Sequence, residues 1–464
     1  MTYLFYDYET TGINEKYDQI VQFAAIRTNE NFEIIQEPFN ILCKIRNDII
    51  PNPLAFLVTK IDIDELQEKG QDEFEFAKKI FEIFTEIENQ CIIGYNSKEF
   101  DDKMSRFLFY RNFLHPYTWS YENNNKTWDL LDILRLGYSF NKLPKINFKL
   151  NNKDTLKLEN LSKINNISHK NAHDALSDVY ATIELMKLIK NQNQNLIKYY
   201  TKLDDYLHNY HLITQSKLFF HISAYYGYDN NFTSLHTPIC NHPFFNKSII
   251  SWDLSKNPTN LLSNNIDSIL KNKFLKKDDK LFDDGFTEIK LNQNPTILKY
   301  TPKTIHPKIN IEDYQKNFNI INKNKNLLSS IANQYFKLEI QKESPDADLY
   351  YNNYFDDYKN DKQNLKKLLS NPTNFNPNLL KSNRFKEQLP IFKGRNFYNQ
   401  LNPDEKTEYD SYINTKINSQ NTDLKWMTKN KFNKDLQEII SQNPDLKQSD
   451  IHILNKLKKY VDSI

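Results

Sequence analysis

Cysteine is scarce in this chain of 464 residues, which contains only three. Cys43, Cys91 and Cys240 lie far apart, and no two of them have the CxxC spacing of a structural zinc site or a redox motif. Small disulfide-stabilised proteins need more cysteines at closer spacings. The sequence therefore excludes a disulfide framework and a zinc-ribbon protein, and a reducing compartment, the cytoplasm, is expected.

Long apolar runs and a strong net charge are also missing. No run reaches the roughly 20 residues of a membrane span, and the first residues, MTYLFYDYE, lack the basic and then apolar pattern of a signal peptide. We therefore expect a cytoplasmic monomer without membrane contact. The formal net charge is only +2, so a nucleic-acid partner would have to be held by a local patch of charge.

Aromatic residues, in contrast, are abundant, with 31 Phe and 28 Tyr. They supply enough apolar surface for packed cores despite a mean hydropathy of −0.73. Strand and helix patterns alternate over 1–190, short strand-like runs dominate 195–345, and helical periodicity returns over 348–464. The polar stretch NQNQN, at 191–195, is expected to be a linker. We predict an α/β domain, a β-rich domain and a helical domain over these three ranges.

The stretch FYDYETTG, at 5–12, carries two acids inside an aromatic strand. Alternate strand residues share a face, so Asp7 and Glu9 point to one side and Tyr8 points to the core on the other. A buried acid is costly unless it is paired or bound to a metal. Hard oxygen ligands favour Mg²⁺ or Mn²⁺ over zinc. Taken alone, the pair favours a solvated sheet face, which explains most D-x-E pairs on strands.

The end of the same strand is expected to lie at the opening of any site. Gly12 ends the strand, so we expect Thr10 and Thr11 to lie at the mouth.

A third acid follows an apolar strand in the middle of the first domain. Asp101 comes after CIIGYN, at 91–96, where a helix is expected to begin. The carboxyl ends of strands in open α/β sheets are where sites form. The alternative for Asp101 is a helix N-cap, and Asp102 fits either role.

The segment NAHDALSDVYAT, at 171–182, places His173 at the start of a helix and Asp178 inside it. The alternatives are an exposed helical acid for Asp178 and a capping or surface imidazole for His173, and each is favoured when its residue is taken alone. The D-x-E strand, Asp101 and this H-x₄-D pattern together fit one chemistry better than chance. Two divalent ions about 3.5–4 Å apart, held by three or four carboxylates, hydrolyse phosphodiesters, and a neutral His takes the proton of the attacking water.

The motifs DYETTG, FD at 100–101 and HDALSD resemble those of the DEDD exonucleases, in the branch whose fifth motif residue is histidine. Further segments, from QFAAIRT to FKGRNF at 392–397, extend the resemblance over essentially the whole chain to the exodeoxyribonuclease I family. The resemblance implies a ribonuclease H-like exonuclease domain over 1–190, a Src-homology-3-like barrel domain over 195–345 and an all-helical C-terminal domain over 348–464. It implies these site residues: Asp7, Glu9, Asp101 and Asp178 as ligands of two Mg²⁺ ions, which Mn²⁺ is able to replace, and His173 as the general base.

The resemblance also implies processive 3′→5′ degradation of single-stranded DNA to 5′-mononucleotides, in a channel formed by the three domains. The implied substrate contacts are Glu9, Arg106, Tyr117, Tyr121, Arg135 and Lys157, with core or crevice filling as the alternative for the aromatic residues. Lys157 stands where the family carries an arginine near the terminal phosphate, and it lacks the bidentate fork of that residue.

Some positions depart from the family pattern or have open roles. Thr11 stands where an aromatic residue often occurs, and Lys60 replaces a usual glycine. Asn141 replaces a basic residue that binds the acidic tail of single-stranded-DNA-binding protein, which leaves that partnership open. Lys393 and Arg395 in FKGRNF fit either channel cations or a solvated face.

Two other functions stay open at this point. One is a DEDD exonuclease that acts on RNA ends or as a proofreader, although such proteins are usually shorter. The other is a single-strand-binding protein whose catalytic site has decayed. The presence of all five catalytic residues argues against decay.

Overall fold

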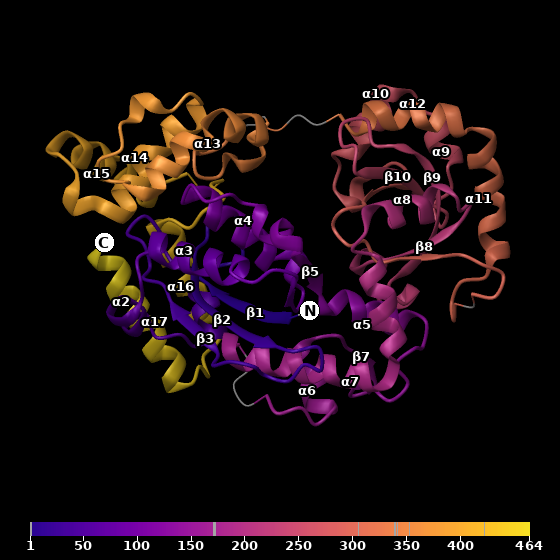
Figure 1. Cartoon of the computed structure of the whole chain (residues 1–464), viewed down its shortest axis with the longest axis horizontal. Helices are drawn as coiled ribbons and strands as arrows, with labels where there is room; N and C mark the ends of the chain where they lie inside the picture. Colours follow the sequence, from indigo (N-terminus) through magenta and orange to yellow (C-terminus); the bar gives the residue numbers. More distant parts are fainter. Residues whose placement is uncertain are drawn as a thin grey trace. The chain divides into compact units, whose positions relative to one another are not determined.

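The computed structural model describes residues 2–169, 173–304, 306–337, 340, 342–351, 353–421 and 423–464. The chain forms two compact units. The first comprises Met1–Trp128, Ser168–Ile183 and Ile340–Ile464, and the second comprises Asp129–Ile167 and Glu184–Glu339. The N-terminal and C-terminal parts of the chain thus share one unit (Figure 1). The three predicted domain ranges stay predictions.

The first unit is built on a mixed sheet with the strand order β3-β2-β1-β4-β5. Its strands are β1 (Thr2–Thr10), β2 (Ile20–Thr28), β3 (Phe39–Leu42), β4 (Gln90–Gly94) and β5 (Lys126–Asp129). Strand β1 pairs antiparallel with β2 and parallel with β4. Strand β2 pairs with Tyr3–Thr10 and β4 pairs with Thr2–Phe5, so the ladders hold the side chains of β1 in register, and Asp7 and Glu9 lie beyond the part that pairs with β4.

One face of this sheet packs on helices α3 (Glu73–Thr85) and α4 (Asp101–Arg111). Tyr6 and Tyr8 of β1 lie in that core with Phe23, Phe84 and Trp119, which confirms that Tyr8 points to the core. Since side chains alternate along a strand, Asp7 and Glu9 lie on the other face. The aromatic residues of FYDYET therefore anchor the strand, and its acids are free for another role.

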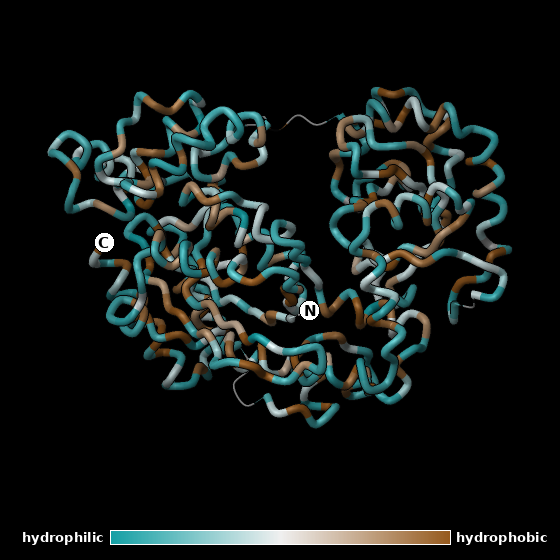
Figure 2. Tube along the Cα trace, viewed as in Figure 1, coloured by the Kyte–Doolittle hydropathy of each residue, from teal (hydrophilic) through white to brown (hydrophobic). Residues whose placement is uncertain are grey.

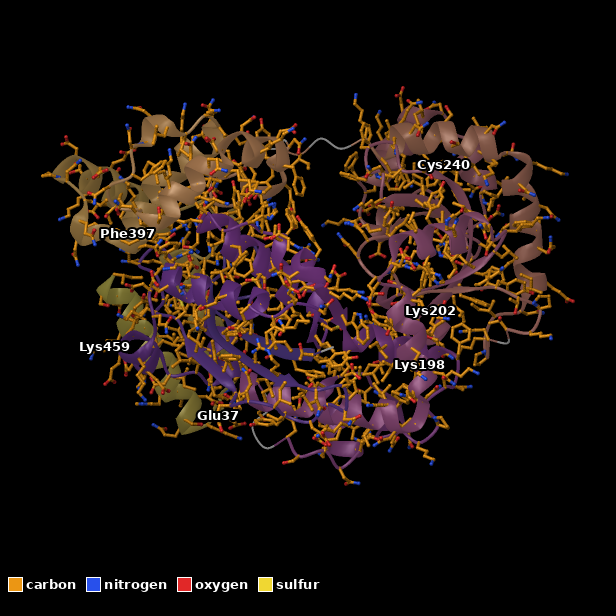
Figure 3. The ribbon with its side chains drawn as sticks, viewed as in Figure 1. Glu37, Lys198, Lys202, Cys240, Phe397 and Lys459 are labelled. Atoms are coloured by element: carbon orange, nitrogen blue, oxygen red, sulfur yellow. The ribbon has the colours of Figure 1, made fainter. Side chains whose placement is uncertain are left out.

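Helices complete the first unit. They are α1 (Pro53–Thr59), α2 (Ile63–Lys69), the start of α7 (Ala175–Lys202), α13 (Tyr354–Ser370), α14 (Asn383–Phe397), α15 (Pro403–Ile417), α16 (Lys429–Gln442) and α17 (Gln448–Ser463). The last two pack against α1 and α2 in one hydrophobic core. Phe397, labelled in Figure 3, ends α14 and packs against Phe74 of α3, with ring centroids 5.8 Å apart.

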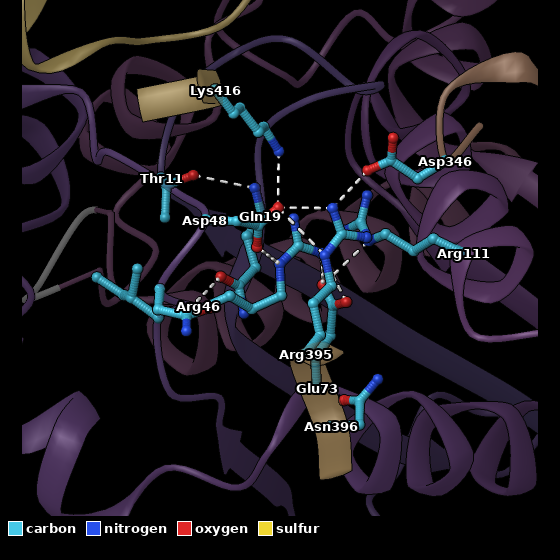
Figure 4. A network of polar contacts seen from close by, with 12 residues as sticks. Thr11, Gln19, Arg46, Asp48, Glu73, Arg111, Asp346, Arg395, Asn396 and Lys416 are labelled. Carbon is cyan, nitrogen blue, oxygen red and sulfur yellow. Dashed lines mark hydrogen bonds and ion pairs between the residues drawn. The ribbon is translucent and has the colours of Figure 1, made fainter. Parts of the chain in front are cut away.

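A buried ionic cluster joins the C-terminal helices to the N-terminal part of the first unit (Figure 4). Asp48 accepts hydrogen bonds from Arg395 (2.6 Å) and Lys416 (2.7 Å). Arg395 also bonds to Asp346 at 2.6 Å. In the same cluster, Glu73 accepts bonds from Arg46 and Arg111. The side chain of Arg395 is 2% exposed, so it is neither a channel cation nor part of a solvated face.

Lys393 and Gly394, which precede Arg395, also pack against neighbouring residues. The side chain of Lys393 is 11% exposed and its Nζ lies 3.7 Å from Glu405, which is a partly buried pair rather than a solvated face. A Cβ on Gly394 would lie 2.2 Å from the Tyr409 ring. The FKGRNF motif therefore fastens α14 to the rest of its unit.

The second unit contains an antiparallel sheet with the strand order β11-β10-β9-β8-β12. Its strands are β8 (Phe219–Ile222), β9 (Thr233–Asn241), β10 (Ser248–Asp253), β11 (Phe286–Lys290) and β12 (Ile297–Lys299), and β6 (Lys149–Leu150) and β7 (Lys153–Asp154) form a separate hairpin. Its helices are α5 (Leu130–Ser139), α6 (Leu158–Ile164), the rest of α7, α8 (Tyr206–Thr214), α9 (Thr259–Leu262), α10 (Ile266–Lys273), α11 (Ile311–Lys323) and α12 (Lys325–Tyr335). A five-stranded sheet and several helices thus share this unit, and helices are more extensive than the predicted β-rich domain implied.

The polar stretch at 191–195 contains a kink, as a break in the pattern indicates, but the linker predicted there is wrong. These residues lie inside α7, which continues to Lys202, and only Asn193 departs from helical geometry, at φ −152° and ψ 78°. Asparagine-rich sequence lowers helix propensity, but Leu196, Ile197 and Tyr200 of the same helix are buried. Tertiary packing therefore keeps the segment helical across a kink.

Hydrophobic stretches follow the strands of each unit, and colours alternate along the outer helices (Figure 2). Among the described residues, no helix combines the length and the apolarity that crossing a membrane would require. Lys60 ends α1 in the left-handed conformation at φ 59°, where glycine is the favoured residue, and its Nζ lies 2.8 Å from Asp450.

We predict that Arg395→Met lowers the free energy of unfolding by about 3–5 kcal/mol, because it leaves Asp346 buried without its cation. Denaturant unfolding followed by tryptophan fluorescence measures this change. The matched control is Lys69→Met, since the pair of Lys69 with Glu65 is 63% and 49% exposed and its loss changes stability by less than about 1 kcal/mol. Equal effects of the two substitutions would contradict the structural role of the cluster.

Candidate active site and metal centre

The face of β1 opposite to Asp7 and Glu9 is hydrogen-bonded to α4, which fixes the position of the two acids. Tyr6 donates a hydrogen bond to Asp102 Oδ1 of α4 at 2.6 Å. The hydroxyls of Tyr8 and Ser105 are 2.9 Å apart. On the edge toward β2, Glu9 stands opposite Gln22 in the ladder. The two acids therefore lie on a strand segment that pairs with β2 and is hydrogen-bonded to α4 through its tyrosines.

The start of α7 brings the third carboxylate to these two. Ligand atoms of Asp7, Glu9 and Asp178 all lie within 4.8 Å of one another. Asp174 caps the helix by accepting a bond from the Ser177 N–H at 3.1 Å, and it also accepts one from Gln22 Nε2 at 3.3 Å. The cap therefore ties the first turn of α7, which carries Asp178, to the strand beside β1.

Asp101 is the first residue of α4 and is buried. The cap position belongs to Phe100, so the N-cap alternative for Asp101 is wrong. The negative charge of Asp101 contributes to raising the pKa of both Asp7 and Glu9. Asp102, which fitted either role, is buried and bonded to Tyr6. Of the two neighbours, Asp101 acts electrostatically on the site and Asp102 joins helix to strand.

Burial and neighbouring negative charges both act on the acids of β1. Burial, followed by the charges of Asp101, Glu9 and Asp178, raises the pKa of Asp7 well above its ordinary value. Burial, followed by Asp178 and Asp101, raises the pKa of Glu9 to about 9. Such shifts arise where like charges share a dry site. Divalent cations would offset the repulsion, and the all-oxygen donor set suits hard cations.

Two histidines lie beside Asp178 at the start of α7. His173 is exposed and in the left-handed region at φ 66°, and its backbone N–H donates to Asp178 Oδ1 at 3.3 Å. His169 was missed by the sequence analysis, yet its Nε2 lies 2.5 Å from the same oxygen. The signal was a second histidine four residues before the first, in ISHKNAH. Residues 170–172, which include the start of the NAHDALSD motif, lie outside the described residues.

The threonines after Glu9 do not lie at a mouth, which corrects the prediction. Thr10 and Thr11 are buried. The hydroxyl of Thr11 accepts a bond from the Gln19 N–H at 2.9 Å, so the loop closes on itself. A Cβ on Gly12 would lie 2.5 Å from the Asp18 carboxylate. Gly12 therefore permits a close approach inside this loop, and Ile13 is the exposed residue, at 85%.

Some expected substrate contacts lie in the first unit. Arg106 of α4 and Tyr117 are half-buried, and the guanidinium lies 5.7 Å from the ring centroid. Tyr117 also stacks on Phe355, with centroids 5.4 Å apart. Tyr121 is 54% exposed. Core filling thus accounts for Trp119, which is fully buried, but not for Tyr121.

Other expected contacts lie in the second unit. Arg135 of α5 pairs with Asp132 at 2.9 Å and lies 5.9 Å from the Phe232 ring centroid. Lys157 is exposed at the start of α6, next to Leu156, whose N–H donates to Tyr228 Oη at 2.8 Å. Asn141 is exposed after α5. Lys157 is therefore an available cation on an anchored segment.

Comparison with known proteins decides the family. Models of three families match successive parts of the chain: Exonuclease over residues 4–186, Exonuclease I SH3-like domain over 207–337, and Exonuclease I C-terminal domain over 343–464. The chain belongs to the exonuclease I family. This confirms the resemblance and the predicted order of an exonuclease, a Src-homology-3-like and a C-terminal domain. The chain is an exodeoxyribonuclease.

Individual members of the exonuclease I family match nearly the full length. Exodeoxyribonuclease I of Buchnera aphidicola subsp. Schizaphis graminum is 37% identical over 90% of this chain and 88% of its own. The zinc-bound form of the E. coli ExoI–ssDNA complex has a TM-score of 0.90 and 31% identity, and covers 100% of this chain and 99% of its own. An ExoI/SSB-Ct complex has a TM-score of 0.88 and 30% identity over 99% of this chain and 98% of its own. The full-length match does not favour an RNA exonuclease, a proofreader or a decayed binding protein.

We predict that the metal-free protein loses stability as pH rises from about 5 to about 9. The native state keeps a proton on Glu9 that the unfolded chain releases near 4.5, and loses it only near 9. One such group contributes up to about 1.4 kcal/mol per pH unit in this window.

Thermal unfolding in a chelator measures the effect. Glu9→Gln should flatten the profile, and Glu82→Gln, an exposed acid, should leave it unchanged. Parallel profiles for all three proteins would contradict the raised pKa.

Proposed function

We propose that this exodeoxyribonuclease removes 5′-mononucleotides processively from the 3′ end of single-stranded DNA, with two divalent cations held by Asp7, Glu9, Asp101 and Asp178. The observation that carries the proposal is the convergence of the Asp7, Glu9 and Asp178 carboxylates to within 4.8 Å. Asp101, on the adjacent helix, completes the set through its charge. The expected pair of ions is Mg²⁺, with Mn²⁺ able to replace it, because every donor is a carboxylate oxygen.

The protein supplies geometry and a proton acceptor. When bound, divalent cations activate water and stabilise the leaving oxygen of a phosphodiester. Strand β1 and α7 hold the carboxylates that position them, and β1 is tied to α4 by Tyr6 and Asp102. His173 accepts the proton of the attacking water at an imidazole nitrogen. Its exposure at the start of α7 leaves the imidazole free to turn toward an incoming 3′ end.

The proposed substrate contacts are aromatic rings and cations, the groups that bind the bases and phosphates of single-stranded DNA. Bases stack on aromatic faces for about 1–3 kcal/mol each, and cations follow the phosphates. Tyr121 is an exposed ring and Arg106 lies beside Tyr117. We expect Arg135 and Lys157 to be the phosphate-contacting cations of the second unit, and Glu9 to contact the terminal nucleotide. The acidic tail of single-stranded-DNA-binding protein is the proposed protein partner, in spite of Asn141.

We predict that the chain releases mononucleotides from 3′-labelled oligo-dT with Mg²⁺, and that Asp178→Asn lowers kcat at least about 10³-fold, because loss of a ligand removes several kcal/mol of charge stabilisation. Gel or chromatographic analysis of the products measures this loss. The exposed acid Asp283 gives the control Asp283→Asn, which should keep the wild-type rate. Equal or faster release from RNA of the same length would contradict the substrate, and a wild-type rate for Asp178→Asn would contradict the site.

We predict that Lys157→Arg lowers KM for oligo-dT several-fold without raising kcat, because a guanidinium binds phosphate in a bidentate manner. Steady-state kinetics with oligonucleotides of one length test this. Lys153→Arg, another exposed lysine of the second unit, is the control and should change neither constant. An unchanged KM for Lys157→Arg would remove this lysine from the phosphate path.

A further inference from the structure

His169 lies against the carboxylate that α7 contributes to the site. Its Nε2 is 2.5 Å from Asp178 Oδ1, and the two side chains are 5% and 16% exposed. The contact joins the segment before the helix to the fourth residue of α7. A short bond between a buried imidazole and a carboxylate is strong and well oriented, so Asp178 has little freedom to rotate.

The other nitrogen of His169 indicates where the proton lies. Nδ1 is buried and accepts or donates no hydrogen bond within the described part of the chain. A buried N–H without an acceptor costs about 1–3 kcal/mol. The favoured neutral tautomer therefore carries its proton on Nε2 and donates it to Asp178, an assignment that follows from the hydrogen-bond network.

The same oxygen of Asp178 receives a second bond, from the backbone N–H of His173 at 3.3 Å. Both bonds are to Oδ1, and the described residues form none with Oδ2. The carboxylate is thus fixed through one oxygen and open at the other. Carboxylates that bind metals are commonly held in this way by bonds from outside the coordination shell.

We propose that His169 is a positioning residue that orients Asp178 for divalent-cation binding. This inference rests on the proposed function, which makes Asp178 a metal ligand. His169 is not the general base, because Nε2 is engaged by Asp178 and Nδ1 is buried. The two histidines of ISHKNAH therefore have different roles: His169 orients a metal ligand, and His173, which is exposed, accepts the proton.

The test measures metal binding by the full-length chain without DNA. Mn²⁺ is titrated into metal-free protein and bound Mn²⁺ is counted by electron paramagnetic resonance. His169→Ala should weaken Mn²⁺ binding 10- to 100-fold, as loss of such a partner typically does. His169→Gln, whose amide N–H reaches a similar position, should restore most of the affinity. His173→Ala should bind Mn²⁺ as the wild type does.

A second readout separates positioning from catalysis. With oligo-dT as substrate, high Mn²⁺ should bring kcat of His169→Ala back toward the wild-type value, whereas His173→Ala should stay inactive at every concentration. Circular dichroism confirms that each variant is folded, and if His169→Ala is not, His169→Gln against His169→Leu provides the same comparison.

The outcomes distinguish this inference from the function on which it rests. If Asp178→Asn binds Mn²⁺ as tightly as the wild type, the proposed ligand set is wrong and the inference falls with it. If Asp178→Asn loses affinity and His169→Ala does not, the ligand set stands and the role of His169 is overturned. If high Mn²⁺ rescues neither histidine variant, His169 takes part in catalysis and the positioning role is also overturned.

Discussion

Repulsion among clustered, largely buried carboxylates is the constraint on which the arrangement of this site depends. Asp7 and Glu9 lie on a central strand, and Asp101 and Asp178 approach them from the first turns of two helices. Burial and mutual repulsion raise the pKa of Asp7 and Glu9. Such an arrangement costs folding free energy unless cations arrive. The core aromatic residues behind β1 and the bonds from α4 keep the acids together in spite of that cost.

The ionic cluster of Figure 4 shows the opposite solution with the same residue types. There Asp48 is buried, but Arg395, Arg46 and Lys416 hold its pKa well below the ordinary value against the effect of burial. The cations of that cluster come from the protein, and two of them come from the C-terminal helices α14 and α15. The contrast assigns the ionic cluster to stability and supports the proposal that the other carboxylates hold divalent cations.

Sequence patterns carried much of this information, and their limits have physical causes. The strand of FYDYET, the helix after Asp101 and the helix of Asp178 were predictable because alternation and periodicity are local properties. The kinked helix through NQNQN was not, because packing of distant residues overrides a polar composition. The predictions that placed Arg395 and Thr11 toward solvent were wrong for the same reason, because the burial of a side chain depends on partners far away in the sequence. His169 was missed because a lone histidine has no signature until Asp178 is placed beside it.

The most direct test of the account is a crystal structure of the chain soaked in Mn²⁺, with anomalous diffraction recorded at a wavelength where manganese scatters strongly. The account predicts an anomalous peak at about 2.0–2.3 Å from carboxylate oxygens of Asp7, Glu9 and Asp178 together. Saturating Mn²⁺ without a peak among these three carboxylates, or with a peak only elsewhere, would contradict it.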